Sequence, residues 1–134
     1  MIGITFSTFD LLHAGHILML KECKQHCDHL VVGMQTDPTI DRPDTKNKPA
    51  QSVYERYIQL MGCAFVDEII PYSTERDVMN ILKTNSIDIR FLGEEYEKVE
   101  FTGKQYCIDN NIKLFYNTRQ HDYSTTELRK RMML

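Results

Sequence analysis

Residues 5–16, with the sequence TFSTFDLLHAGH, decide the fold that we expect for this chain. The stretch begins with β-favouring Thr and Phe residues and continues as an amphipathic helix. His13 and His16 stand three positions apart at the expected helix start, so both imidazoles lie on one face. Gly15 leaves the backbone between them open to a ligand. Because a helix start also offers unpaired N–H groups and a positive dipole end, the stretch predicts a phosphate site.

Strand-like and helix-like segments alternate along the rest of the sequence. The strands are expected at residues 2–6, 29–35, 65–71, 87–92 and 113–116. The helices are expected at residues 14–27, 52–63, 74–85, 98–111 and 124–132. This alternation predicts an α/β fold in one domain, residues 1–134, with a five-stranded parallel sheet flanked by helices on both faces.

The composition is that of an ordinary globular protein. A net charge of −3 predicts no broad basic surface, so we expect no nucleic-acid partner. The sequence has neither a secretory signal pattern nor an apolar run of membrane-spanning length, so we expect a cytoplasmic protein with no membrane partner. Cys23 and Cys27 share a helix face, which fits either reduced thiols or a zinc site, and we favour reduced thiols without a metal.

Four loops follow predicted strands, at residues 8–16, 37–49, 93–96 and 119–126. In a parallel sheet, ligands bind beyond the carboxyl ends of the strands, so these loops should converge on one edge. The last loop, RQHDYSTT, offers the cation of Arg119 and the hydroxyls of Ser124 and Thr125 before a helix. Ser124 and Glu127 have capping-box spacing, and alone these hydroxyls would only cap the helix. With Arg119 beside them, the set suits a triphosphate.

The two motifs together resemble the cytidylyltransferase-like nucleotidyltransferases. Residues 13–16 match the H-x-G-H signature, and residues 119–126 are similar to the family pattern R-T-x-x-I-S-T-T, with Gln120 and Tyr123 as departures. Within this family, TFDLLHAGH most resembles the glycerol-3-phosphate cytidylyltransferases. The resemblance implies a Rossmann-like nucleotidyltransferase fold and transfer of CMP from CTP to sn-glycerol 3-phosphate. The products would be pyrophosphate and CDP-glycerol, a precursor of teichoic-acid-like or capsular polymers.

The resemblance also implies a role for each site residue. Stabilisation of the reacting phosphates is expected from His13, His16, Lys46 and Arg119. Nucleotide contacts are expected from Thr8, Phe9, Asp10, Gly15, Gly93, Glu94, Ser124 and Thr125. Acceptor contacts are expected from Lys48, Arg56 and Tyr96. Asp10 should orient its turn or a basic neighbour rather than act as a base. Mg²⁺ should arrive with CTP, bound mainly through the triphosphate, and the resemblance implies a homodimer.

Three positions leave alternatives open. Either Lys46 or Lys48 reaches the phosphates, and we favour Lys46. Arg56 fits a basic family position but also a structural role. Ala64 stands where relatives carry an arginine near the acceptor, so another cation compensates or the acceptor differs.

Two other functions remain compatible with these motifs. The same fold transfers AMP to a flavin or pantetheine phosphate, or a nucleotide to a sugar phosphate, and H-x-G-H does not separate these reactions. A non-catalytic nucleotide-binding module would fit the loss of arginine at Ala64 and the altered Gly93-Glu94-Glu95-Tyr96 loop.

Overall fold

Five parallel strands form the sheet of this protein, whose computed structural model describes residues 1–133. They are β1 (Ile2–Ser7), β2 (His29–Gln35), β3 (Glu68–Tyr72), β4 (Ile89–Gly93) and β5 (Lys113–Asn117). The strand order is β3-β2-β1-β4-β5, and every neighbouring pair is parallel. The α/β class and the five-stranded parallel sheet are therefore confirmed.

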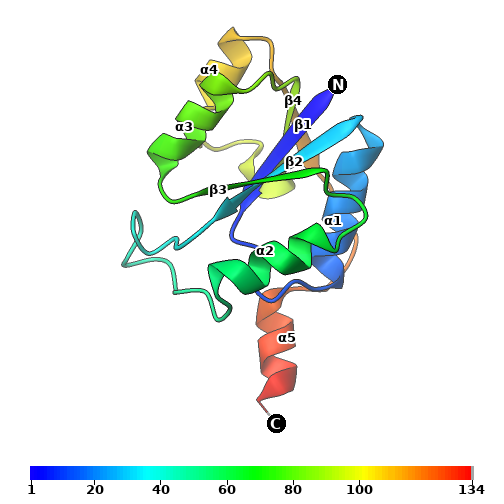
Figure 1. Cartoon of the computed structure of the whole chain (residues 1–134), viewed down its shortest axis with the longest axis vertical. Helices are drawn as coiled ribbons and strands as arrows, with labels where there is room; N and C mark the ends of the chain where they lie inside the picture. The colour runs from blue at the N-terminus through cyan, green and yellow to red at the C-terminus, as the bar shows by residue number, and fades with distance from the viewer. Residues whose placement is uncertain (134) are drawn as a thin grey trace.

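Helices cover both faces of the sheet (Figure 1). They are α1 (Ala14–Gln25), α2 (Val53–Met61), α3 (Glu75–Thr84), α4 (Lys104–Asp109) and α5 (Thr125–Met132), with a 3-10 turn η1 (Glu94–Tyr96). One core cluster joins Leu20 of α1 and Leu60 of α2 to the sheet. A second cluster joins Val78 of α3 and Cys107 of α4 to the opposite face. Figure 1 shows α5 projecting from the body at the end opposite the N-terminus.

Side-chain caps explain why the helices begin where they do. Ser52 and Glu55 form a capping box at α2, and Thr74 and Asp77 form another at α3. Each cap satisfies backbone N–H groups that the helix leaves unpaired and stabilises it by about 1 kcal/mol. At α5, the Ser124 hydroxyl accepts from the Glu127 N–H, which is one half of the capping box expected there.

Most predicted segments agree with the structure to within two residues at each end, but two of them begin at the wrong place. The helix expected at residues 98–111 is confined to Lys104–Asp109. Its N-cap, Gly103, has a φ of 84°, a left-handed conformation that ends the preceding turn and favours glycine. The strand expected at residues 65–71 begins only at Glu68, because residues 63–66 form a turn in which the Val66 N–H donates to the Cys63 carbonyl.

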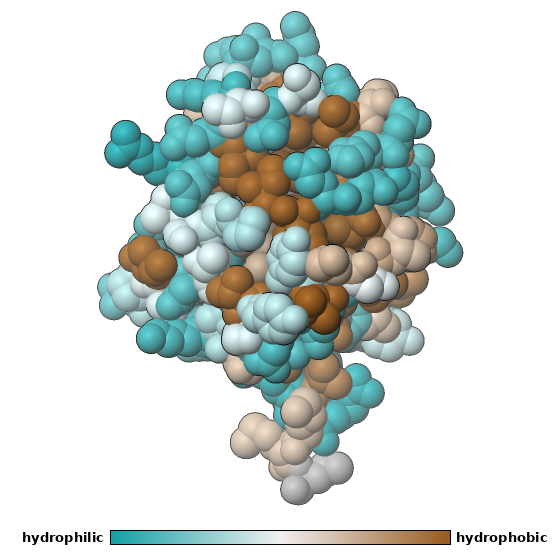
Figure 2. Space-filling model, in the orientation of Figure 1, coloured by the Kyte–Doolittle hydropathy of each residue, from teal (hydrophilic) through white to brown (hydrophobic). Residues whose placement is uncertain are grey.

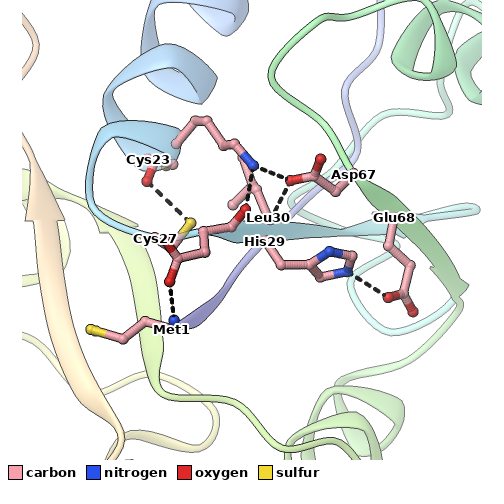
Figure 3. A network of polar contacts seen from close by, with 9 residues as sticks. Met1, Cys23, Cys27, His29, Leu30, Asp67 and Glu68 are labelled. Carbon is pink, nitrogen blue, oxygen red and sulfur yellow. Dashed lines mark hydrogen bonds and ion pairs between the residues drawn. The ribbon is translucent and has the colours of Figure 1, made fainter.

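Polar contacts fix the amino ends of β1, β2 and β3, away from the loops expected to bind ligand (Figure 3). Asp67 accepts hydrogen bonds from the Lys24 ammonium and from the Leu30 N–H, the latter at 2.8 Å. His29 and Glu68 lie 3.0 Å apart on neighbouring strands. This network holds β3 in register with β2 and therefore serves the fold.

The strand order places a switch point between β1 and β4. Helices that follow β1 and β2 lie on one face, whereas those that follow β3 and β4 lie on the other. A crevice forms at such a point beyond the carboxyl ends of the strands. Within residues 1–133, no helix is long and apolar enough to cross a membrane.

Candidate active site

Both histidines of the H-x-G-H stretch are held by the first turn of α1. His13 is the N-cap, and its Nδ1 accepts from the Gly15 N–H at 3.0 Å. The His13 N–H in turn donates to Nδ1 of His16 at 3.2 Å. An imidazole nitrogen that accepts a backbone N–H carries no proton, so the proton of each neutral ring sits on Nε2. Two donors are thereby prepared for a ligand, and the ring centroids are 4.0 Å apart.

The surroundings keep both rings neutral. Burial, with a smaller contribution from the neighbouring His13, lowers the pKa of His16 to about 4. The pKa of His13 is also lowered, first by burial and then by His121 and Arg119. At neutral pH, the pair therefore acts through hydrogen bonds and not as imidazolium cations.

A strained turn links β1 to these histidines. Phe9 and Leu11 adopt left-handed φ values of 54° and 51°, which cost free energy and persist only where the surroundings hold them. Phe9 is buried in the core, where its ring packs against His16, so a ligand can meet only its main chain. Asp10 accepts from the N–H groups of Ala50 and Gln51 at 2.8 and 3.0 Å. Asp10 thus orients the turn, the arrangement that we expect of it.

The structure brings the two sequence motifs to one cleft. Its volume is about 680 Å³, within the range of small-molecule sites. The predicted site residues that line it are His13, Gly15, His16, Gly93, Glu94, Arg119, Ser124 and Thr125. Arg119 donates to the carbonyls of His121 and Tyr123, which shapes the loop before α5. Residues more than 100 positions apart in the sequence therefore face the same space.

His121 is a site residue to which the sequence analysis gave no role. A Cβ atom at Gly15 would lie 2.9 Å from Cε1 of His121 and 2.8 Å from Cε1 of His13. Gly15 is therefore needed because two imidazoles pack over it. The only sequence signal was the position of His121 within the 119–126 motif.

Glu22 and Asn117 also line the cleft without having been predicted. Asn117 ends β5, and its amide donates to the Glu22 carboxylate at 2.8 Å. The Thr118 N–H donates to the same carboxylate at 3.2 Å. Glu22 of α1 thereby fixes the end of β5, from which the Arg119 loop departs.

A second cavity of about 560 Å³ lies on the other side of the β4 end. Gly93 and Glu95 line both cavities, so the two spaces adjoin. The predicted residues Thr8, Lys46 and Tyr96 line the second one. Lys48 is exposed and belongs to the lining of neither cavity in the described chain. This placement favours Lys46, as the sequence analysis did.

Arg56 corrects an expectation, because it lies in the core and not at the acceptor site. Only 1% of its surface is exposed. Its guanidinium donates to four backbone carbonyls, at distances of 2.6 to 3.2 Å, from Thr8, Gln35, Thr36 and Gln51. A guanidinium has five donors, so this side chain is nearly satisfied by the fold itself. Its role is to join the ends of β1 and β2 to the start of α2.

The titratable side chains of residues 1–133 are too scattered to hold a metal ion as a group. No cluster of three or more His, Cys, Asp or Glu residues there is placed to hold an ion. The cysteines at positions 23, 27, 63 and 107 are free thiols.

The cytidylyltransferase-like family model matches residues 4–131 of the chain. The chain belongs to the cytidylyltransferase-like family. This cytidylyltransferase-like protein is 34% identical to the glycerol-3-phosphate cytidylyltransferase of Bacillus subtilis, over 95% of the chain and 93% of the relative. The corresponding protein of Bacillus spizizenii is 32% identical over 96% of the chain and 95% of the relative.

Other relatives are longer or are known as structures. The bifunctional protein HldE of Caulobacter is 29% identical over 98% of the chain, which spans only 27% of that relative. A lipopolysaccharide core biosynthesis protein from Thermoplasma volcanium superposes with a TM-score of 0.75 at 28% identity, covering 90% of this chain and 98% of that one. These likenesses show a nucleotidyltransferase fold.

Proposed function

We propose that this protein transfers CMP from CTP to a small phosphorylated alcohol, with sn-glycerol 3-phosphate as the first candidate acceptor. The observation that carries the proposal is the pair of neutral histidines, whose Nδ1 atoms are both occupied by backbone N–H groups. Their Nε2 donors share a cleft with Arg119. The likeness to two glycerol-3-phosphate cytidylyltransferases supports the choice of substrates.

The chemistry is an in-line displacement at phosphorus. An oxygen of the acceptor's phosphate attacks the α-phosphorus of CTP and forms a new P–O bond. The bond from the α-phosphorus to its bridging oxygen breaks, and pyrophosphate leaves with that electron pair. Negative charge grows on the α-phosphate oxygens, where fixed donors lower the barrier. His16 is the more buried histidine, and we place it nearest the α-phosphate.

The same cleft offers groups that suit the remaining charges of the nucleotide. Arg119 and the hydroxyls of Ser124 and Thr125 at the α5 start suit the β- and γ-phosphates. The described side chains form no dedicated metal cluster, which fits Mg²⁺ entering with CTP on phosphate and water ligands. When bound in this way, Mg²⁺ would neutralise charge on the leaving pyrophosphate.

A second candidate keeps this mechanism and changes the acceptor. Ala64 is exposed at the position where the family pattern carries an arginine. The likeness to HldE and to a lipopolysaccharide core biosynthesis protein also supports an acceptor other than glycerol 3-phosphate. A sugar phosphate would be such an acceptor.

Pyrophosphate release tests both candidates. CTP, ATP, GTP and UTP would each be paired with glycerol 3-phosphate and with a panel of phosphorylated sugars and alcohols. Release that requires CTP and glycerol 3-phosphate would establish the first candidate. Release with CTP and another acceptor would establish the second. Binding of CTP without release for any acceptor would contradict both and favour a nucleotide-binding module.

We also propose that the protein is a homodimer, as its family resemblance implies. Val53, Ile58 and Met61 are exposed apolar residues of α2. Figure 1 places α2 on the face drawn in Figure 2, where apolar residues gather between polar regions. Such exposed patches commonly mark protein interfaces. Sedimentation equilibrium would test this: a mass of two chains that falls to one in Ile58→Glu supports it, and a monomer at all concentrations contradicts it.

A further inference from the structure

Arg90 is a buried cation that the proposed chemistry leaves unused. It lies on β4 with 6% of its surface exposed and lines the second cavity. Its guanidinium carbon is 5.0 Å from the centres of the Phe6 and Phe101 rings, so the group is sandwiched between two aromatic side chains. This stacking fixes the plane of the guanidinium and directs its donor edge.

The hydrogen bonds of Arg90 are incomplete. One donor, on Nη1, reaches the Thr102 carbonyl, the Cys107 thiol lies beside the guanidinium as a weak neutral partner, and Nε is buried without a partner. No carboxylate oxygen within residues 1–133 lies within 4.0 Å of its nitrogens. Arg56, the other deeply buried arginine, has four carbonyl partners. A buried charge that lacks such partners is costly, so Arg90 is poorly explained as a structural residue.

The other cations of the cavity are differently placed. The Nε of Arg42 is also buried without a hydrogen-bond partner, but Arg42 lies 3.6 Å from the Glu75 carboxylate, so its charge is compensated within the protein. Lys46 lines the cavity from an exposed loop and is therefore not buried. Of the three cations that line the second cavity, Arg90 is thus the one that is buried and has no carboxylate partner among residues 1–133.

We propose that Arg90 determines acceptor specificity by binding a second anionic group, at the end of the acceptor distal from the phosphate that attacks CTP. This inference rests on the proposed function, because it takes the second cavity as the acceptor site, and it favours the second candidate there, an acceptor other than glycerol 3-phosphate, which has only one anionic group. The acceptor class is then a phosphorylated small molecule that also carries a carboxylate or a second phosphate. The acceptor's anion would complete the partners of Arg90, as a buried guanidinium requires.

A matched pair of acceptors tests the proposal in the unmodified protein. Glycerol phosphate and 3-phosphoglycerate differ at one carbon, which is an alcohol in the first and a carboxylate in the second. Each would be supplied as both C2 stereoisomers, and glycerol 1,3-bisphosphate would represent a second phosphate. Equilibrium binding would be measured by calorimetry in the presence of a non-hydrolysable CTP analogue. We expect at least about tenfold tighter binding of the carboxylate or bisphosphate compound.

Two substitutions then locate the effect. Arg90→Met should remove the preference while CTP binding persists, and Arg90→Lys, which keeps the charge, should retain part of it. Arg42→Met is the matched control, because Glu75 already pairs with Arg42. It should leave the ratio of the two acceptors' Kd values within about twofold of that in the unmodified protein. If Arg90→Met does not fold, the test uses Arg90→Lys instead: a weaker preference for the second anionic group in Arg90→Lys than in Arg42→Met would support the role of Arg90.

The outcomes separate this inference from the proposed function. Equal binding of the paired acceptors by the unmodified protein would overturn the role of Arg90. An equal shift of the ratio in Arg42→Met would overturn it also, since only the net charge of the cavity would then matter. Because binding is measured without turnover, a protein that releases no pyrophosphate still answers the question about Arg90, and only the proposed function would fail.

Discussion

Arg129 of α5 donates a hydrogen bond from Nη2 to the Asp10 carboxylate at 2.9 Å, across 119 positions of sequence. Asp10 lies in the turn before His13 and also accepts from the Ala50 and Gln51 N–H groups. The carboxylate therefore joins the histidine turn, the start of α2 and the helix that begins with Ser124 and Thr125. Because α5 buries none of its own residues, this contact is a principal restraint on its position.

The first prediction concerns that restraint. Arg129→Met should raise the KM for CTP several-fold, because the α5 start would no longer be held over the cleft. Lys130→Met is the matched control, since the Lys130 ammonium pairs with Glu127 on its own helix, at 3.6 Å. Steady-state kinetics of both variants would check this. Equal KM values for the two variants would show that α5 is positioned by other contacts.

His16 is predicted to act mainly in the transition state. His16→Ala should lower kcat by about 100-fold to 1000-fold, the usual cost of losing a donor to developing charge. CTP affinity should change much less, because the contact strengthens as charge grows on the α-phosphate. Single-turnover kinetics with separate CTP titration would measure both quantities. Near-normal turnover would remove His16 from the mechanism.

The depressed pKa of His16 predicts a pH dependence of folding stability. Its folded-state value is about 4, whereas the unfolded side chain titrates near 6.5. Between these values, the unfolded chain binds more protons, so stability falls as pH falls from about 6.5 to about 4. Chemical denaturation at several pH values should show a smaller fall for His16→Gln, which titrates no imidazole there. An identical pH dependence of the free energy of unfolding in the two proteins would contradict the burial of a neutral His16 ring.

Gly15→Ala should separate stability from activity. Alanine favours the helix over glycine by about 1 kcal/mol, which offsets the weakening of the His13 cap, so the free energy of unfolding should change by less than about 1 kcal/mol. The added Cβ would meet the His13 and His121 rings at 2.8 and 2.9 Å, and it must displace them. Turnover should fall by at least about tenfold, because misplaced donors lose transition-state contact. Full activity in a stable variant would show that the rings move without consequence.

Arg56→Met should destabilise the fold, whichever substrates the protein uses. The change removes donors to carbonyls of Thr8, Gln35, Thr36 and Gln51. Losing such a buried network costs about 3–5 kcal/mol. Urea unfolding would measure the loss. An acceptor-specific defect with unchanged stability would instead return Arg56 to the acceptor site.

Part of the site could be predicted because its signals are local. The caps at Ser52 and Thr74 and the turn that ends at His13 depend on atoms within a few residues of one another. The start of the helix expected at residue 98 was not predictable in this way. Gly103 adopts a left-handed backbone conformation that ends the preceding turn, and the spacing of apolar residues does not reveal it. Convergence of the loops was predictable from strand polarity alone.

The sequence by itself determined the alternation of strands and helices, the histidine pair at a helix start and the family to which the chain belongs. Only the tertiary structure decided that Arg56 is a core residue, that His121 covers Gly15, and that Arg90 faces a cavity between two phenylalanines. Side-chain identity cannot distinguish these roles, because an arginine has the same donors on a surface as in a core. Contacts between distant segments, such as that of Arg129 with Asp10, decide which carbonyl, carboxylate or ligand those donors meet.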